Sequence, residues 1–316
     1  MLFLLTSRLI KNLTFIHLET LNPYSPVYCF KDSSFNVDKI AAYHLCLNFS
    51  AKSFDVAIFE TAKDFCLHYE SYRLQNVFTI HDLIQNVEQI LQNHEFLQAG
   101  FWHSVVAVVS NQKFSFVPQD FFDDDQKNLF LSVNAELDNL KEEVLANFHR
   151  SQKVYNIFSV EKIFIEWLNK TYANRKPVLV HEMTAFIEGL LTEPQILNDG
   201  YLHLLVKSDK LLIASFKNGE LNFVNSFLLQ RSTDFLYFVM LVLEELGLDK
   251  NKIQLHLYGE IEKQIQAMLA KFTWKLGQRI KGVTYSSQLD ELAPHLALDT
   301  LSAYHVSKPN FRLFVY

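Results

Sequence analysis

The 316 residues are 49% hydrophobic and 20% charged, with a formal net charge of −6. This length is sufficient for two domains, and the apolar content is too high for a chain that is disordered throughout. The acidic balance argues against a protein built to neutralise a nucleic-acid backbone, and no stretch is apolar over the length of a membrane span. These properties predict a globular protein without a transmembrane segment.

The cysteines and the N-terminus bear on the compartment. Cys29, Cys46 and Cys66 are an odd number and include no C-x-x-C pair, so they do not form a disulfide framework. Residues 1–27 begin with a short apolar run that precedes the basic residues, which is the reverse of a secretory signal. We therefore expect an N-terminal extension at 1–27 and a cytoplasmic location.

The first half of the chain has a clear order of elements. Alternation of apolar and polar residues is the signal for strands, and apolar residues three and four apart are the signal for a helix. The predicted strands are 43–49, 54–60, 65–72 and 105–109, and a helix at 80–91 precedes the last of them.

The second half repeats this order about 158 residues later. Asn218-Gly219 is a typical two-residue hairpin turn between its second and third strands. The predicted strands are 202–206, 211–216, 221–229 and 253–258, with helices at 232–246 and 261–271. Between the halves we expect strands at 154–158 and 177–180 and helices at 160–172 and 184–191.

Three antiparallel strands, a helix and then a parallel strand form the ribonuclease-H-like arrangement. Because each half is interpreted as three strands, a helix, a strand and a helix, the sequence predicts an α/β protein with duplicated ribonuclease-H-like domains. Their mixed sheets would be flanked by helices. Thr192-Glu193-Pro194 ends the last helix before the second half. The expected domains are 28–195 and 196–316, the second of which ends in an apolar, aromatic tail at 309–316.

Several stretches carry a family resemblance. They are residues 43–45 with the hairpin to 68–70, and residues 116–122, 155–162, 177–181 and 255–261. Together they resemble an uncharacterised bacterial family of unknown function with an actin-like ATPase fold, and more distantly the actin-like proteins of pilus assembly and secretion. The resemblance covers about residues 27–285. It implies a two-domain actin-like fold, and it implies no activity, because the family has none established.

The resemblance also indicates where a nucleotide would bind. Actin-like ATPases hold phosphates with one Asp-x-Gly hairpin in each domain, because the Asp positions Mg²⁺ and the Gly lets backbone N–H groups approach. At these places the chain has Asn48-Phe49-Ser50 and Leu205-Val206-Lys207, so both carboxylates and both glycines are missing.

The adenosine end of the site is changed as well. Gly259 is kept there, but it is followed by Glu260. The degenerate nucleotide positions are Asn48, Ser50, Lys52, Lys207 and Gly259, and we expect neither a bound cofactor nor catalytic residues.

Other groups of reactive side chains have plainer explanations. His44, Cys46, Cys66 and His68 are zinc-ligand types, but an intervening strand would place the two pairs about 10 Å apart, too far for zinc bonds. Asp residues at 123–125 suit the start of a helix. His181-Glu182 lacks the second histidine of a zinc-protease motif. We expect no metal site.

Three functions follow in order of preference. The first is a non-catalytic binding or scaffold module that engages a protein partner or a second copy of itself. The second is a divergent ATP-binding or ATP-hydrolysing protein that contacts phosphate through Lys52 or Lys207. The third is a nucleic-acid-associated role through the basic stretch at 271–281, which is otherwise a solvated edge strand.

Overall fold

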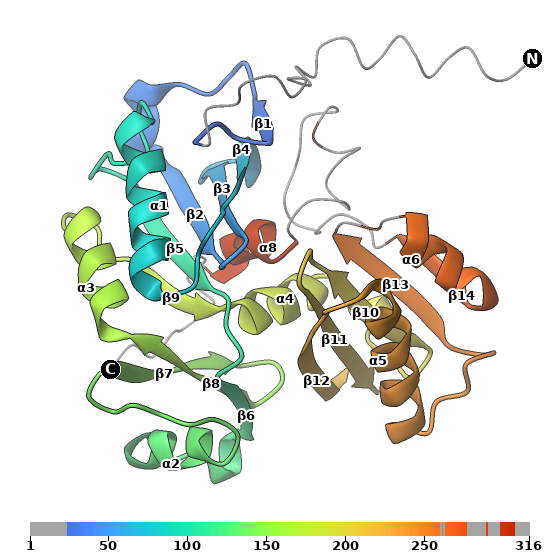
Figure 1. Ribbon diagram of the computed structural model, residues 1–316. Coiled ribbons are helices and arrows are strands. Elements are labelled where there is room, and N and C mark those ends of the chain that lie inside the picture. The colour runs from blue at the N-terminus through green and yellow to red at the C-terminus, as the bar shows by residue number, and fades with distance from the viewer. Residues whose placement is uncertain (1–23, 260, 262, 277–288, 290–297, 307–316) are drawn as a thin grey trace, which may run out of the picture.

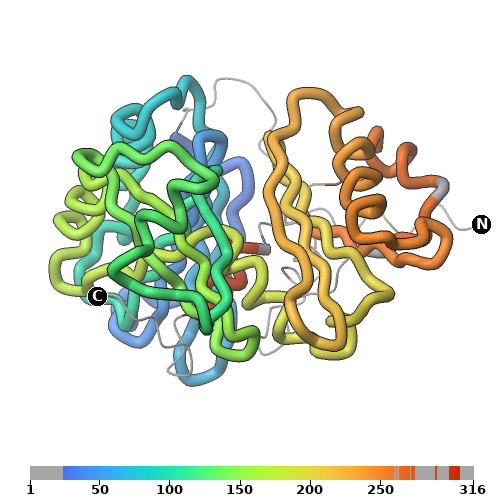
Figure 2. Tube along the Cα trace, turned by 90° about the horizontal axis from the view of Figure 1, so that it is seen from below, coloured from blue at the N-terminus to red at the C-terminus, as the bar shows by residue number. Residues whose placement is uncertain are grey.

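The computed structural model describes residues 24–259, 261, 263–276, 289 and 298–306. The described chain forms two lobes, each built on a mixed β-sheet, and a small third sheet is attached to the first lobe (Figures 1 and 2). None of the helices in these residues is long and apolar enough to cross a membrane. The predicted tail at 309–316 lies outside the described residues.

The first lobe has six strands in the order β1-β4-β3-β2-β5-β9. The strands β1, β4, β3 and β2 pair antiparallel in that order, whereas β2–β5 and β5–β9 pair parallel. Helices α1 and α3 pack on one face, and α4 packs on the other. The elements are β1 (Tyr28–Lys31), η2 (Val37–Ala42), β2 (Tyr43–Phe49), β3 (Ser53–Glu60), β4 (Phe65–Arg73), α1 (Ile80–Asn93), β5 (Ser104–Val109), α3 (Lys162–Thr171), β9 (Val178–His181) and α4 (Glu182–Leu190).

The second lobe repeats five of the six strands of the first, all but the edge strand β1, in the order β12-β11-β10-β13-β14. Its first three strands pair antiparallel, and β10–β13 and β13–β14 pair parallel. The elements are η5 (Pro194–Ile196), β10 (Tyr201–Val206), β11 (Lys210–Lys217), β12 (Glu220–Leu228), α5 (Ser232–Glu245), β13 (Gln254–Gly259), α6 (Lys263–Met268), η6 (Leu269–Lys271) and β14 (Thr273–Leu276). The duplicated ribonuclease-H-like fold predicted from the sequence is confirmed.

A three-stranded sheet interrupts the first repeat and was only partly predicted. It has the order β6-β8-β7 and a small apolar core of its own around Leu131 and Ile157. We predicted only one of its strands, at 154–158. The sheet is inserted between β5, which is the fourth strand of the repeat, and the helix that follows it, α3. Its elements are β6 (Phe114–Pro118), η3 (Gln119–Phe121), η4 (Asp124–Gln126), α2 (Lys127–Ser132), β7 (Glu142–His149) and β8 (Val154–Glu161).

A late helix, α8 (Leu298–Val306), returns from the second repeat to the first lobe. It packs against α4 and against β2, β3 and β5, and this is visible as the red helix behind the first sheet in Figure 1. One buried cluster contains residues of α4, α8 and both central sheets. The core between the lobes is therefore continuous, and α8 carries polar side chains into it.

Candidate functional site in the cleft between the lobes

Two equivalent hairpin turns face each other between the lobes. In the first, the backbone N–H of Ser50 donates to the carbonyl of Ser53 at 3.0 Å. In the second, the N–H of Lys207 donates to the carbonyl of Lys210 at 2.9 Å. Both turns line one pocket, so the duplication brings the ends of β2 and β10 to the same cleft.

The structure gathers the positions singled out from the sequence in this cleft. Ser50, Lys52, Lys207 and Gly259 line the pocket. Asn48 is buried behind it, where its side-chain amide donates to Asp299 Oδ2 at 2.8 Å and to Thr300 Oγ1 at 2.9 Å. The amide therefore joins the first lobe to α8.

The lysine of the second hairpin is engaged by the chain's own carboxylates. Lys207 Nζ lies 2.6 Å from Asp299 Oδ2 and 3.2 Å from Glu182 Oε2. Both carboxylates are fully buried, and the lysine side chain is 12% exposed. Burial alone would lower the pKa of Lys207, but Asp299 and Glu182 raise it well above its usual value, so the ammonium stays charged.

A second lysine completes this group, which we call the cleft ion-pair cluster (Lys207, Lys210, Glu182 and Asp299). Lys210 Nζ lies 3.0 Å from Glu182 Oε1 and donates to Ser110 Oγ at 2.8 Å. Burial would raise the pKa of Glu182, whereas Lys210 and Lys207 lower it to about 2. The two ammonium and two carboxylate charges of the cluster cancel.

Glu182 is placed by a helix start. It is the first residue of α4, and His181 caps the helix by accepting a hydrogen bond at Nδ1 from the N–H of Met183 at 3.2 Å. Burial lowers the pKa of His181 to about 4, so the imidazole is neutral at physiological pH. The His-Glu pair seen in the sequence thus consists of a cap and an ion-pair partner.

One further buried carboxylate faces the same pocket. Asp55 on β3 is opposite Asn48 in the sheet register, and it accepts hydrogen bonds from Ser53 Oγ at 3.0 Å and Tyr69 Oη at 3.3 Å. Burial raises its pKa to about 6, in spite of hydrogen bonds and Lys207, which lower it. Asp55 therefore loses its proton closer to neutral pH than an ordinary aspartate does.

Gly259 has a structural reason to be glycine. Its φ is +85°, and a Cβ at this position would lie 2.2 Å from the carbonyl oxygen of Val206. This close approach comes from the parallel pairing of β13 with β10, in which Gly259 is opposite Val206. The backbone of the sheet alone therefore explains the glycine.

Sequence reasoning missed Asp55, Glu182, Lys210 and Asp299. The available signal was a charged residue inside an apolar run: Asp55 interrupts a buried strand, and Asp299 stands within a helix whose side chains from 299 to 304 are all buried. Such a pattern indicates a buried polar contact. It does not identify the partner, which for Asp299 is 92 residues away at Lys207 and 251 residues away at Asn48.

The zinc-ligand types considered from the sequence separate as expected. Strand β3 lies between β2, which carries His44 and Cys46, and β4, which carries Cys66 and His68. A different group of ligand-type side chains comes together in the described residues at the outer edge of the first sheet. The ligand atoms of Cys29, His68 and Glu70 all lie within 4.8 Å of one another.

Comparison with known proteins identifies the family. Residues 32–271 match the model of the family described as "Protein of unknown function (DUF3822)". The chain belongs to this family. No curated protein matches it.

Two solved structures are similar in fold. A Bacteroides thetaiotaomicron protein of actin-like ATPase fold and unknown function is 20% identical, with a TM-score of 0.71 over 85% of this chain and 99% of that chain. The PilM–PilN type IV pilus biogenesis complex contains a chain that is 13% identical, with a TM-score of 0.54 over 84% and 99% of the two chains. At these identities the similarity shows the fold, which is actin-like as expected.

Proposed function

We propose that this member of the family is a non-catalytic binding module whose cleft is closed to nucleotide by its own ion pairs. The module would act by engaging another protein. We further propose that its two parts correspond to residues 28–195 and 196–316. The proposal includes a cytoplasmic location.

The cleft ion-pair cluster carries the proposal. An incoming triphosphate needs cations that are not already neutralised, and Lys207, the lysine at the base of the cleft, contacts two buried carboxylates. A phosphate that displaced Glu182 or Asp299 would leave a carboxylate without its partner in a buried site, which is strongly unfavourable. Asp55 adds a further negative charge above pH of about 6.

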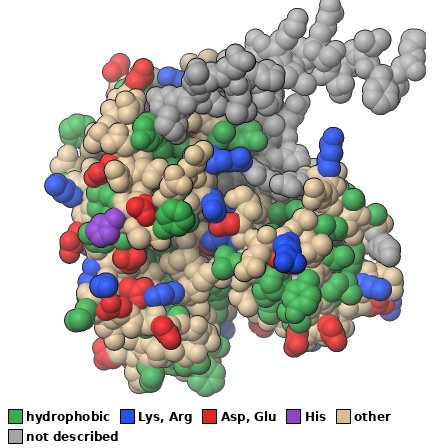
Figure 3. Space-filling model, in the orientation of Figure 1, with side chains coloured by type: hydrophobic (Ala, Val, Ile, Leu, Met, Phe, Trp, Pro, Cys, Tyr) green, Lys and Arg blue, Asp and Glu red, His purple; other side chains and the backbone are tan. Residues whose placement is uncertain are grey.

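A surface on the second lobe supports a protein partner. Leu228, Tyr237 and Met240 are 52%, 63% and 38% exposed. They belong to β12 and α5, where hydrophobic side chains gather in the lower right of Figure 3. Contiguous exposed apolar side chains of this kind are typical of protein contacts. Among proteins of similar fold, PilM is found in a two-protein complex with PilN.

Calorimetric titration of the purified protein with Mg·ATP, and with Mg·ADP in parallel, tests the proposal. We expect no binding heat up to millimolar nucleotide. Micromolar binding of either nucleotide would contradict it.

Nucleotide binding is the second candidate, and the mouth of the pocket favours it. Lys52 and Arg73 line this pocket, and both residues are exposed. They could contact phosphate without breaking the cluster. If this candidate were correct, Lys52→Ala would weaken nucleotide binding, whereas the equally exposed Lys39→Ala, on η2, would not.

The nucleic-acid role stays a prediction. The basic stretch at 271–281 is described only as far as β14. This strand is the outermost one in the described part of the second sheet. RNA binding that weakens steeply with salt would support this role.

A further inference from the structure

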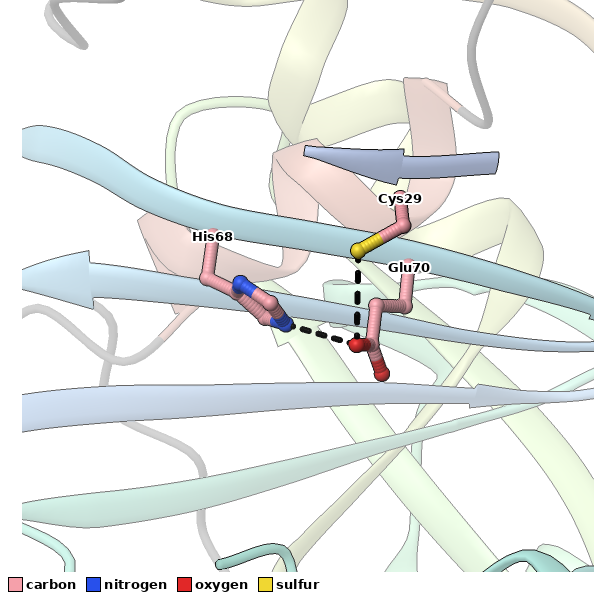
Figure 4. A group of neighbouring side chains, drawn as sticks. All are labelled: Cys29, His68 and Glu70. Atoms are coloured by element: carbon pink, nitrogen blue, oxygen red, sulfur yellow. Dashed lines mark hydrogen bonds and ion pairs between the residues drawn. The ribbon is translucent and has the colours of Figure 1, made fainter. Parts of the chain in front are cut away.

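Three side chains converge at the outer edge of the first sheet, away from the cleft. Cys29 on the edge strand β1 is directly opposite Glu70 on β4. His68 is two residues before Glu70, so the two side chains project from the same face of the strand. Figure 4 shows the Cys29 thiol and the His68 ring directed toward the Glu70 carboxylate.

The spacing of these atoms fits a tetrahedral metal. Cys29 Sγ lies 3.7 Å from Glu70 Oε1, and His68 Nε2 lies 3.0 Å from the same oxygen. With zinc bonds of about 2.0–2.3 Å, the ligand atoms of a tetrahedron are roughly 3.3–3.7 Å apart. All three ligand atoms lie within 4.8 Å of one another, so side-chain shifts of about an ångström would place them on one ion.

The buried His68 ring lacks the hydrogen bonds that such a ring normally has. Its side chain is 2% exposed, and among the described residues neither ring nitrogen has a hydrogen-bond partner of acceptable geometry. The contact of Nε2 with Glu70 Oε1, at 3.0 Å, is an ion pair when the ring is protonated. Since buried polar atoms are nearly always paired, a missing ligand at Nε2 explains this one.

The carboxylate of Glu70 is held in the orientation that such a ligand needs. Tyr72 Oη donates to Glu70 Oε2 at 2.7 Å, and His94 Nε2 lies 3.0 Å from the same oxygen. His94 Nδ1 faces the backbone N–H groups of Phe96 and Leu97, so Nε2 carries the proton and donates. Oε2 is thus occupied by protein donors, and Oε1 is left facing Cys29 and His68.

We propose that Cys29 Sγ, His68 Nε2 and Glu70 Oε1 bind a zinc ion, with the fourth tetrahedral position taken by a ligand from outside this set. A thiolate and an imidazole favour zinc over magnesium or calcium. Tyr72 and His94 fix the carboxylate as outer partners. The ion would join the exposed edge strand β1 to β4, and none of its three ligands lines the cleft pocket.

Zinc binding in competition with a chromophoric chelator tests the proposal, with the thiols kept reduced. We expect one zinc per chain in the wild type, and affinity at least about tenfold weaker in Cys29→Ser. Cys46→Ala, which removes a buried thiol on another strand, is the matched control and should bind as the wild type does. Because Cys29 lies on an exposed edge strand, its substitution tests binding without disturbing the core.

A second measurement reports the bond itself. Loading with Co²⁺ should give the ultraviolet charge-transfer absorption of a thiolate–cobalt bond, and this absorption should be absent in Cys29→Ser and present in Cys46→Ala. Failure of the wild type to bind zinc, or equal binding by both variants, would overturn the proposal.

Discussion

Two buried glutamates of the first lobe are stabilised as anions by different chemistry. Glu182, in the cleft, is held by two lysines, and Glu70, at the sheet edge, is held by two histidines and a tyrosine. In both cases burial would raise the carboxyl pKa, and the neighbours lower it instead. Lysines keep their proton and their charge at all physiological pH values. Imidazoles and thiols can instead lose a proton and bind a metal ion in its place.

This difference separates a structural role from a binding role. The cleft is where the actin-like fold would lead one to look for a ligand, yet the lysines and carboxylates of the cleft ion-pair cluster are already paired with one another. Among the described residues β1 has no counterpart in the second repeat, and neither ring nitrogen of His68 at this edge has a hydrogen-bond partner. The four substitutions that follow test this comparison.

The largest effect is expected at the cleft glutamate. Glu182→Gln leaves Lys207 and Lys210 buried with one carboxylate fewer, so the free energy of unfolding should fall by about 3–5 kcal/mol in urea denaturation. The exposed pair Lys63–Glu60 is the control, and Glu60→Gln should change stability by less than about 1 kcal/mol. Equal effects of the two substitutions would show that the cleft charges are solvated and available.

Gly259→Ala tests whether the glycine of the cleft serves the sheet. The new Cβ would meet the carbonyl of Val206 at 2.2 Å, so we expect a loss of roughly 2–4 kcal/mol in unfolding free energy. Gly219 has the same positive φ but open space around it, and Gly219→Ala should destabilise by only about 1 kcal/mol. If Gly259→Ala were as mild as its control, the close approach would not explain the glycine.

Asp55→Asn should stabilise the protein at neutral pH. Because its folded-state pKa is raised to about 6, the folded state binds this proton more tightly than the unfolded state does, and stability falls as pH rises from about 4 to 6. An uncharged amide avoids this loss, so we expect a gain of about 1–2 kcal/mol at pH 7 that disappears near pH 4. Chemical denaturation at both pH values measures this change in unfolding free energy. A gain that persists at pH 4 would mean that packing, and not the charge of Asp55, causes it.

The smallest effect concerns the sheet edge. Tyr72→Phe removes the hydroxyl that holds Glu70 Oε2, and zinc affinity should fall about tenfold. Tyr172→Phe is the control, because this buried hydroxyl of the same lobe donates to the carbonyl of Leu97 and not to Glu70. Equal zinc affinities of the two variants would remove Tyr72 from the site.

The sequence predicted the repeated strands well because each is marked by alternation and bounded by turn residues. The hairpin positions Ser50 and Lys207 were placed correctly for the same reason, since local pairing fixes them. Helix α8 was not predicted, because buried side chains follow one another from 299 to 304 and leave no amphipathic period. The partners of Asp299 depend on how this helix returns to the first lobe, and no local signal contains that information.

The edge site was out of reach for a related reason. Cys29 meets Glu70 through the register of β1 on β4, and β1 is four residues long with mostly exposed side chains. Such a strand has no apolar alternation to reveal it. His68 was recognised as a ligand type, but it was grouped with Cys66 on the same strand and not with Cys29.

Equilibrium dialysis of one reduced preparation against Zn²⁺ and, separately, against Mg·ATP tests the account most directly. We predict that each chain retains one zinc ion and that no nucleotide is retained at micromolar concentration. Retention of nucleotide without zinc would contradict the account, because the cleft would then be the binding site and the edge cluster only a structural network.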